Sequence, residues 1–437
     1  MEKNERLEAT PARSPRFSRR RLLKSAATLA SAALVPSSVA RLASAVQSLT
    51  AAKPDSPKTR LANNPRWYGF NLLEYFSTDT DWMKYFPYKN DGMFLENDFR
   101  WIRDWGFNWV RLPMDYRFWT SPDLFTIDEK NVEPIDRAIR LGEKFGIHVN
   151  LCLHRAPGLC ILDTMDEKLT GIHITKEKTD VFTDSHTFDA FVHQWTYFAD
   201  RYKGIPSKQL SFNLVNEPVV LPNAAELAEM RQRGQIKPAD LFSPERMRRH
   251  EKDYVRLAKA AYEAIHQHDP QRLVISDGYA GGGWAVPDLT GSGMIQSCHT
   301  YTPMQLTHHN CEWVRGVLTG AEPAPTWPLK DEKGKIVCDR QTLKNLFAPW
   351  GTLSAQGVPI HFGEMGCYKH TAPQVVQAWF RDTLDVIGEL NSGWALWNFR
   401  GPFGVLDTER TGTKFEEWRG HKLDRPLLTL LQQKIRT

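Results

Sequence analysis

Residues 210–218 have the sequence Leu-Ser-Phe-Asn-Leu-Val-Asn-Glu-Pro, a short β-rich run, Leu210–Val215, that ends in the polar pair Asn216 and Glu217. From Trp67 onward the same arrangement recurs, because short β-rich runs alternate with longer helical stretches and each run ends in polar residues. Eight such strands alternating with helices predict the α/β class and a single (β/α)₈ TIM barrel. The other seven runs are Tyr68–Leu73, Asn108–Leu112, His148–Leu153, Leu273–Ser276, Ile295–Thr300, Pro359–Phe362 and Trp394–Asn398.

The segments between the runs complete this prediction. Asn131–Lys144 and Arg248–Gln267 carry apolar residues near helical spacing, and Arg425–Arg436 is expected to form a final helix that packs on the barrel. The extra length lies in residues 219–244 and 302–340, which we expect to be elaborated loops at the C-terminal face. An open doubly wound sheet is the alternative, and it is disfavoured because no glycine-rich phosphate-binding turn follows an early run.

The positive charge of the chain is concentrated at its beginning. Of the net charge of +5, residues 1–45 carry +6 and the remainder carries −1. A near-neutral body gives no support to a nucleic-acid partner, which would require a basic patch.

The first 45 residues have the pattern of an export signal. The basic segment Ser18–Lys24 precedes a weakly apolar run, Ser25–Val35, and then Ala43-Ser44-Ala45, after which cleavage is expected. The apolar run is too short for a permanent membrane span, which takes about 20 residues. The pair Arg19-Arg20 resembles a twin-arginine signal, whose export machinery carries folded proteins to a periplasmic or extracellular location. A basic disordered tail is the alternative.

The signal divides the chain into three parts. Residues 1–45 are the predicted signal peptide, residues 46–65 are a flexible leader rich in Ala, Pro, Ser, Lys and Asn, and residues 66–437 form the barrel domain.

The cysteines leave two possibilities open. An even number in an exported protein permits disulfides, whereas folding in a reducing cytoplasm before export favours free thiols. The spacing of Cys152, His154 and Cys160 matches no common zinc pattern, and neither does the segment His308–Cys311, so we expect neither a metal nor a cofactor. The six cysteines are Cys152, Cys160, Cys298, Cys311, Cys338 and Cys367.

Polar residues just past the strand ends of such a barrel face its active site. Glu217 and Glu364 are therefore expected to project into one pocket from opposite sides, and two carboxylates that face each other are what glycoside hydrolysis requires. Taken singly, each residue has a structural interpretation; Glu364, for example, could be a buried ion-pair partner of Arg111. The coincidence of the whole set at six strand ends favours a functional site made of Arg111, His154, Asn216, Glu217, His299, Tyr301, Glu364 and Trp397.

The order of the motifs carries a family resemblance. The series that resembles glycoside hydrolase family 5 consists of Arg111-Leu112-Pro113, Leu153-His154 with Pro157-Gly158, Asn216-Glu217-Pro218, His299-Thr300-Tyr301, Gly363-Glu364 and Trp397. The resemblance spans about residues 67–430 and implies a retaining, metal-free (β/α)₈ hydrolase of the group that includes cellulases and mannanases.

The resemblance also implies roles for these residues. Glu217 would be the acid/base, Glu364 the nucleophile, and Asn216 would hold the sugar 2-hydroxyl. Arg111 and Tyr301 would keep Glu364 ionised, since a guanidinium and a hydroxyl beside a carboxylate lower its pKa. Retention would place the two carboxyl groups about 5–5.5 Å apart.

The same subsite would be lined by His154 and His299, with Trp397 as its floor, since a flat indole suits the apolar face of a sugar ring. Glu74 and Asp277, just past two further runs, could meet substrate hydroxyls, although a salt bridge or a turn cap is the slightly favoured interpretation for both. Four loop tryptophans are candidate sugar platforms, with loop packing as the default: Trp119, Trp284, Trp313 and Trp327.

The sequence thus predicts an exported retaining hydrolase of β-1,4-linked polysaccharide, an endo-β-1,4-glucanase in the leading interpretation. A β-mannanase or another β-glycosidase of the family is the nearest alternative. A non-catalytic carbohydrate-binding protein is a third, disfavoured because both glutamates are present. A metal-dependent barrel hydrolase is a further alternative. It would require His-x-His after the first run, where the chain has Asn71-Leu72-Leu73-Glu74 instead.

Overall fold

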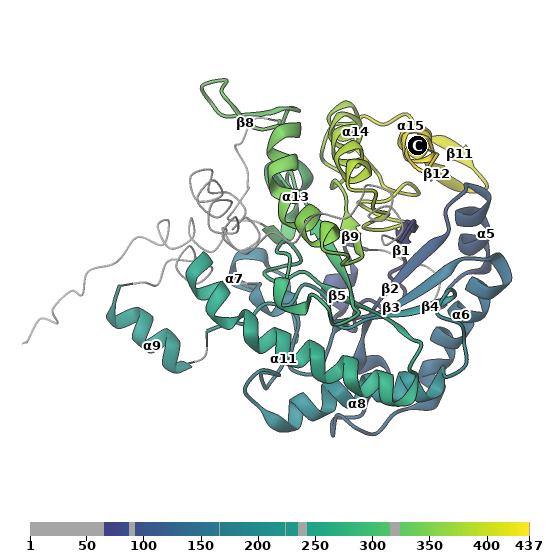
Figure 1. Ribbon diagram of the computed structural model, residues 1–437. Helices are drawn as coiled ribbons and strands as arrows, with labels where there is room; N and C mark the ends of the chain where they lie inside the picture. Colours follow the sequence, from purple (N-terminus) through teal and green to yellow (C-terminus); the bar gives the residue numbers. More distant parts are fainter. Residues whose placement is uncertain are drawn as a thin grey trace, which may run out of the picture.

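The computed structural model describes residues 65–86, 92–165, 167–222, 224–234, 243–314 and 324–436. The predicted signal peptide and all but the last residue of the predicted leader lie outside these residues. Eight parallel strands close into a barrel in the order β1-β10-β9-β6-β5-β4-β3-β2, which confirms the predicted TIM barrel (Figure 1). The strands are β1 (Tyr68–Asn71), β2 (Trp109–Asp115), β3 (His148–Arg155), β4 (Leu210–Asn213), β5 (Leu273–Asp277), β6 (Ile295–Thr300), β9 (Ile360–Met365) and β10 (Trp394–Leu396).

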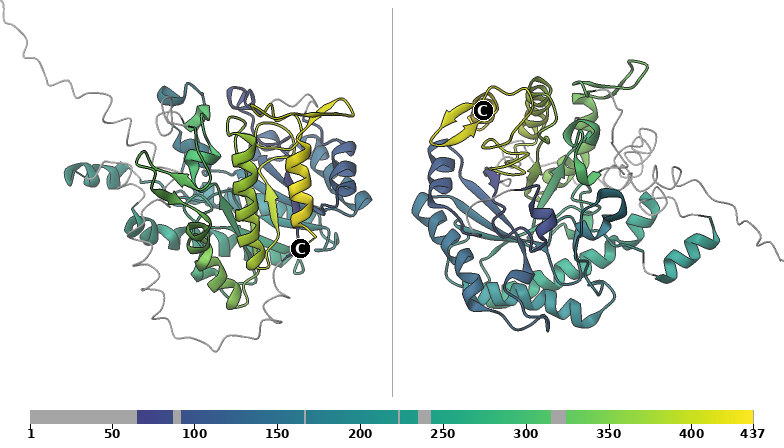
Figure 2. Two further views of the ribbon diagram at one scale, coloured as in Figure 1. Left: turned by 90° about the horizontal axis from the view of Figure 1, so that it is seen from above. Right: turned by 180° about the vertical axis from the view of Figure 1, so that it is seen from behind.

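The helices surround this barrel, as the views in Figures 1 and 2 show. Two short antiparallel ribbons lie outside it, β7 (Leu329–Lys330) with β8 (Ile336–Cys338) and β11 (Glu416–Trp418) with β12 (His421–Leu423). The helices are α4 (Thr80–Met83), α5 (Glu96–Asp104), α6 (Glu133–Phe145), α7 (Glu167–Thr170), α8 (Ser185–Arg201), α9 (Ala224–Gln232), α11 (Pro244–His268), α12 (Met304–Thr307), α13 (Arg340–Ala355), α14 (Pro373–Glu389) and α15 (Arg425–Lys434).

All eight predicted strands are present, with shifted ends. β2 continues to Asp115 because it pairs with β3 as far as Arg155, whereas β10 already ends at Leu396. The helix predicted from Asn131 begins as a 3₁₀ turn, and α6 proper starts at Glu133, next to a proline in its first turn. Gly146 ends α6 at φ +67°, a left-handed conformation that glycine adopts without strain.

The long connections contain secondary structure of their own. The segment after β4 includes α9, which projects from the barrel in Figure 2. The segment after β6 includes α12 and the β7–β8 ribbon. The predicted last helix is α15, which packs against α14. It is also tied to the end of α5, since Gln432 donates to the carbonyl of Trp105 at 3.1 Å.

Two apolar clusters stabilise these layers. The larger one fills the space between the strands and the surrounding helices. The second, which we call the mouth cluster, joins side chains that follow β1, β3, β6, β9 and β10, among them Phe76, Ile172, Trp313, Tyr368 and Trp397. Within the part of the chain that the structure describes, no helix has the length and apolar character needed to span a membrane.

Candidate active site

Seven of the eight predicted site residues lie at or just past the C-terminal ends of barrel strands, and the eighth, Arg111, lies within β2. Because the strands are parallel and the barrel is closed, these ends form one rim. Arg111 belongs to β2, His154 to β3, His299 to β6 and Glu364 to β9, while Asn216 and Glu217 follow β4, Tyr301 follows β6 and Trp397 follows β10.

Arg111 is the centre of the hydrogen-bond network. Its side chain is buried, and its Nη1 donates to Glu364 Oε1 at 2.5 Å and to Asn71 Oδ1 at 3.0 Å. Its Nη2 donates to Asn216 Oδ1 at 2.8 Å, and its Nε to Asn213 Oδ1 at 2.8 Å. The planar guanidinium therefore fixes one predicted catalytic carboxylate and the neighbouring amide at the same time.

The second partner of Glu364 is the predicted one, since the Tyr301 hydroxyl donates to Oε2 at 3.1 Å. Glu364 is only 2% exposed, and burial raises its pKa to about 7 although His299 and Arg111 act in the opposite direction. The contacts of Glu364 are thus as expected, but the expected lowering of its pKa is wrong, because loss of hydration outweighs the neighbouring cations.

Glu217 is held at both its side chain and its backbone. Its Oε1 lies 3.0 Å from His299 Nδ1, and its peptide N–H donates to Asp277 Oδ2 at 3.1 Å. Its φ of +47° is a conformation that non-glycine residues seldom adopt. A carboxylate oxygen of Glu217 and one of Glu364 lie within 4.8 Å of each other, so the two groups face one another across the rim.

His299 stands between these carboxylates. Its Nδ1 is 3.6 Å from Glu364 Oε1, and its Nε2 is 3.2 Å from Asp277 Oδ2. Burial by itself would lower the pKa of His299, but the charges of Asp277 and Glu364 outweigh it and raise the pKa to about 10. The surrounding carboxylates therefore favour the imidazolium form of His299 at neutral pH.

Several members of the network were missed or left open by sequence reasoning. Asp277 forms ion pairs with Arg111 and His299 and is fully buried, so the salt-bridge interpretation holds for it. Asn71 and Asn213 were not predicted; each is the amide that ends its strand, directly after a phenylalanine, and that signal could have identified them.

Three buried polar atoms of the predicted set have no hydrogen-bond partner among the described residues: Asn216 Nδ2, His154 Nδ1 and His299 Nε2. His299 Nε2 lies at ion-pair distance from Asp277 Oδ2, 3.2 Å, without hydrogen-bond geometry. Buried polar groups are normally paired, so Asn216 Nδ2 and His154 Nδ1 mark where a ligand group could bind. Glu74, which sequence reasoning left open, is also buried at this rim.

The aromatic members of the site pack against one another. The His154 ring is stacked on Trp397 with centroids 5.6 Å apart, and Phe76 contacts both rings edge-on, at 4.5 Å and 5.4 Å. Trp397 belongs to the mouth cluster. The predicted floor is thus supported from the loop that follows β1.

Two of the loop tryptophans have a packing role. Trp119 is 1% exposed and donates through Nε1 to Gln194 at 2.9 Å. Trp327 donates through its indole N–H to Asp382 at 2.8 Å, so its side chain lies against the outer helix α14.

The other two tryptophans lie at the mouth of the barrel or in the loop after β5. Trp313 packs against Trp82 in the mouth cluster, with centroids 5.0 Å apart. Trp284 is half-buried and has the Arg248 guanidinium 4.6 Å above its ring, in a loop whose Gly282 carbonyl accepts the peptide N–H of His299. Its use as a sugar platform stays a prediction.

Among the described residues, one group of His, Cys, Asp and Glu side chains has ligand atoms close enough together to hold a metal ion: Glu217, His299 and Glu364. Two basic side chains already contact its carboxylates, since Arg111 pairs with Glu364 and the His299 ring lies against both glutamates. The Cys152–Cys160 and His308–Cys311 segments contribute no such group within the described ranges.

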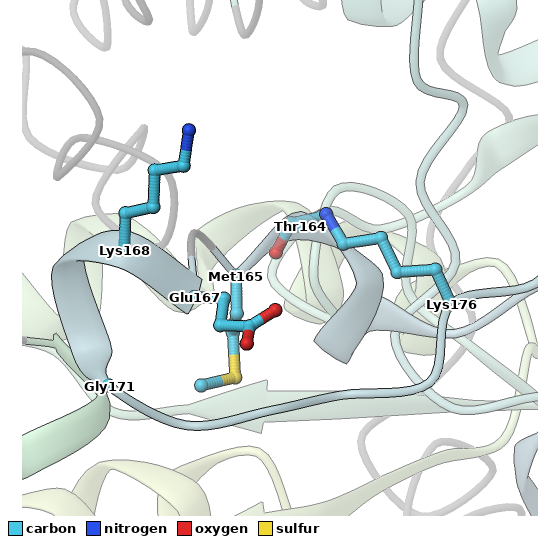
Figure 3. A pocket seen from close by; sticks show the side chains of 6 residues that line it. All are labelled: Thr164, Met165, Glu167, Lys168, Gly171 and Lys176. Carbon is cyan, nitrogen blue, oxygen red and sulfur yellow. The ribbon is translucent and has the colours of Figure 1, made fainter.

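A separate pocket lies in the loop after β3 (Figure 3), and none of the eight predicted site residues lines it. In Figure 3, Lys168 extends away from Met165 and Glu167. The lining residues are Thr164, Met165, Glu167, Lys168, Gly171 and Lys176.

Comparison with known proteins places this geometry in a family. Residues 66–401 match the family model described as Cellulase (glycosyl hydrolase family 5). A solved crystal structure described as a glycoside hydrolase is 35% identical with a TM-score of 0.69, over 84% of this chain and 99% of the other.

Two curated relatives are more distant. Endoglucanase C of Acetivibrio thermocellus is 21% identical over 336 residues, which cover 71% of this chain and 85% of the relative. Cellodextrinase A of Ruminococcus flavefaciens is 22% identical over 307 residues, which cover 69% of this chain and 77% of the relative.

Proposed function

The chain belongs to glycoside hydrolase family 5, and on that premise we propose that it is a retaining endo-β-1,4-glucanase in which Glu364 is the nucleophile and Glu217 the acid/base. The observation that carries the proposal is the pair of carboxylates whose oxygens approach within 4.8 Å of each other at the barrel mouth. This close spacing supports retention, since inverting enzymes hold their carboxyl groups farther apart to admit a water molecule.

In the first step, a sugar ring lies over Trp397 and Glu364 attacks its anomeric carbon. Arg111 and Tyr301 orient the attacking carboxylate through its two oxygens. Glu217 donates its proton to the departing glycosidic oxygen, and the negative charge that then forms on Glu217 lies 3.0 Å from the His299 ring. The product of this step is a glycosyl-enzyme intermediate.

In the second step, water replaces the leaving group. Glu217, now a carboxylate, accepts a proton from this water while the oxygen attacks the anomeric carbon. Glu364 departs as the leaving group, and two inversions give net retention.

The sugar hydroxyls need partners in this scheme. Asn216 Nδ2 and His154 Nδ1 are buried and otherwise unpaired, which supports a role for them in binding hydroxyls. Because Arg111 holds Asn216 Oδ1 at 2.8 Å, the amide group of Asn216 is oriented before the sugar binds. We assign the 2-hydroxyl to Asn216.

The glucan substrate is inferred from the endoglucanase among the relatives. The test is a reducing-end assay of the purified protein on carboxymethylcellulose, mixed-linkage glucan, mannan, xylan and short cellodextrins. We expect cleavage of the two glucans and internal cuts that lower the viscosity of carboxymethylcellulose. Preference for mannan would replace the glucanase assignment by that of a mannanase.

The roles of the two glutamates are tested with variants. Glu364→Gln should abolish activity on every substrate, because the attacking charge is lost. Glu217→Ala should lower kcat/KM for glucan by about 10²- to 10⁴-fold but spare activated aryl glycosides, which depart without protonation. Azide should speed turnover of Glu217→Ala and give a β-glycosyl azide. An α-azide, or azide rescue of Glu364→Gln with retention, would reverse the assignment.

We further propose that the enzyme is exported through the twin-arginine route. The Arg19-Arg20 pair supports this proposal, as do the six buried free cysteines, which suit a protein that folds in a reducing compartment before export. Replacing both Arg19 and Arg20 by Lys should retain the precursor in the cytoplasm, whereas the control replacement of Arg13 and Arg16 by Lys should not. Undiminished export of the Arg19 and Arg20 variant would contradict this proposal.

A further inference from the structure

Asp277, the last residue of β5, has no role in the proposed reaction. Its side chain is fully buried beneath the two glutamates and does not reach the surface of the site. The following inference rests on the proposed function, in particular on Glu217 as the acid/base.

A single oxygen of Asp277 meets three members of the site. Oδ2 accepts the peptide N–H of Glu217 at 3.1 Å and lies 3.2 Å from His299 Nε2 and 3.4 Å from Arg111 Nη2. The other oxygen, Oδ1, accepts from Asn213 Nδ2 at 2.8 Å, which fixes the orientation of the carboxylate. Asp277 thus contacts the acid/base directly, whereas on Arg111 it meets Nη2 and not the Nη1 that holds Glu364.

The backbone contact explains how Glu217 keeps its conformation. At φ +47°, Glu217 has a backbone geometry that a non-glycine residue holds only when its surroundings fix it. The hydrogen bond from its N–H to the charged Asp277 is such a constraint, because bonds to ionised acceptors are shorter and stronger than neutral ones.

The second contact reaches the Glu217 side chain through His299. One ring nitrogen, Nε2, lies 3.2 Å from Asp277 Oδ2, an ion-pair distance without hydrogen-bond geometry, and the other, Nδ1, lies 3.0 Å from Glu217 Oε1. Gly282 packs against this ring, and a Cβ there would be 2.7 Å from it, so glycine at this position makes room for the ring.

We propose that Asp277 is a positioning residue for the acid/base Glu217, which it holds directly at the peptide N–H and indirectly through His299. Asp277 transfers no proton and keeps its negative charge throughout. Besides Glu217, the charged and titratable groups that face Asp277 are Arg111 from β2, Cys152 and His154 from β3, Tyr254 from α11, Cys298 and His299 from β6, and Glu364 from β9. The anion therefore keeps His299 protonated, with its Nδ1–H bound to Glu217 in both steps of the reaction.

The test is Asp277→Asn, which preserves the side-chain volume and removes the charge. The matched control is Asp269→Asn, which removes another buried carboxylate. Asp269 is paired with Arg272 at 2.7 Å and lies just before the N-terminal end of β5.

For a cello-oligosaccharide, kcat/KM of Asp277→Asn should fall by about 10- to 100-fold, part of what a general acid contributes. For 2,4-dinitrophenyl β-cellobioside, kcat/KM should change by less than about threefold, because departure of this group needs no proton. For Asp277→Asn with the same aryl substrate, kcat and KM should both fall in proportion, because the hydrolysis of the glycosyl-enzyme intermediate becomes slower.

A purely structural role would lower kcat/KM for both substrates equally, and that result would overturn the proposal. If the wild-type enzyme cleaves neither substrate, the proposed function fails instead. If Asp277→Asn does not fold, the proposal is tested on the wild-type enzyme by ¹⁵N NMR of its histidine rings. The His299 signals are assigned by comparison with the variant His299→Gln. A His299 ring protonated on both nitrogens at pH 8 is the expected result, and a neutral ring at that pH would overturn the proposal.

Discussion

The carboxyl group of Glu364 is under two opposing influences. Burial favours its neutral form, while Arg111 and His299 favour the carboxylate, and burial prevails so that the pKa is raised to about 7. The burial that excludes water from the site thus also moves its proposed nucleophile into the physiological range of titration.

This balance predicts an acidic limb in the pH profile. Glu364 attacks only as a carboxylate, so kcat/KM for 2,4-dinitrophenyl β-cellobioside should fall about tenfold for each pH unit below 7. The aryl substrate isolates Glu364 because it does not need the Glu217 proton. The other groups that face Glu364 are Tyr301, Glu217 and Asp277, and the Tyr301 hydroxyl stays protonated because burial raises its pKa well above the usual range.

Circular dichroism over the same pH range should show a folded protein, so that the loss of activity is not unfolding. A profile that stays flat down to pH 5 would contradict the raised pKa of Glu364.

At the scale of elements, the loop after β3 is tied to the barrel by Arg155. This buried residue pairs through Nη1 with Asp163 at 3.1 Å and with Glu177 at 2.9 Å. Asp79, from the loop after β1, lies 3.6 Å from its Nη2. A single guanidinium thus compensates carboxylates from two loops that border the mouth cluster.

Removing this cation should cost much more than removing an exposed one. Arg155→Met should lower the free energy of unfolding by about 3–5 kcal/mol, because it removes the cation that is paired with the largely buried Asp163 and Glu177. The control Arg425→Met breaks the pair with Glu416 at 2.7 Å, which is 38% and 42% exposed, and should cost about 0–1 kcal/mol. Urea unfolding of the three proteins provides the comparison. Equal losses in both variants would show that the loop is held by other contacts.

At the scale of the whole molecule, stability rests on packing without covalent cross-links. All six cysteines are free and buried, and burial raises the pKa of the Cys152 and Cys298 thiols well above the usual range. Buried neutral thiols react slowly.

A thiol titration should therefore give two distinct results. The native protein should expose no reactive thiol to Ellman's reagent, and the unreduced protein in denaturant should expose six. Dithiothreitol should leave the Tm unchanged, because there is no disulfide to reduce. Fewer than six thiols after denaturation, together with a Tm lowered by reduction, would reveal a disulfide.

The sequence by itself determined the barrel and the place of its chemistry. Runs such as Leu210–Val215 and Ile295–Thr300 predicted strands, and the residues after them, including Glu217 and Tyr301, are at the rim. These are local properties, since hydrophobic pattern and strand direction are set by neighbouring residues, and parallel strands place all their C-terminal ends on one side.

Only the tertiary structure decided how the site is held and charged. Asn71 Nδ2 donates to the carbonyl of Leu396 at 3.1 Å only after barrel closure brings β1 beside β10. Arg111 of β2 likewise meets Asn213 of β4 and Asp277 of β5 across the assembled barrel. The direction of the Glu364 pKa shift was predicted wrongly from its neighbours alone. Desolvation depends on everything packed around a group, and this packing exists only once the barrel and its loops are assembled.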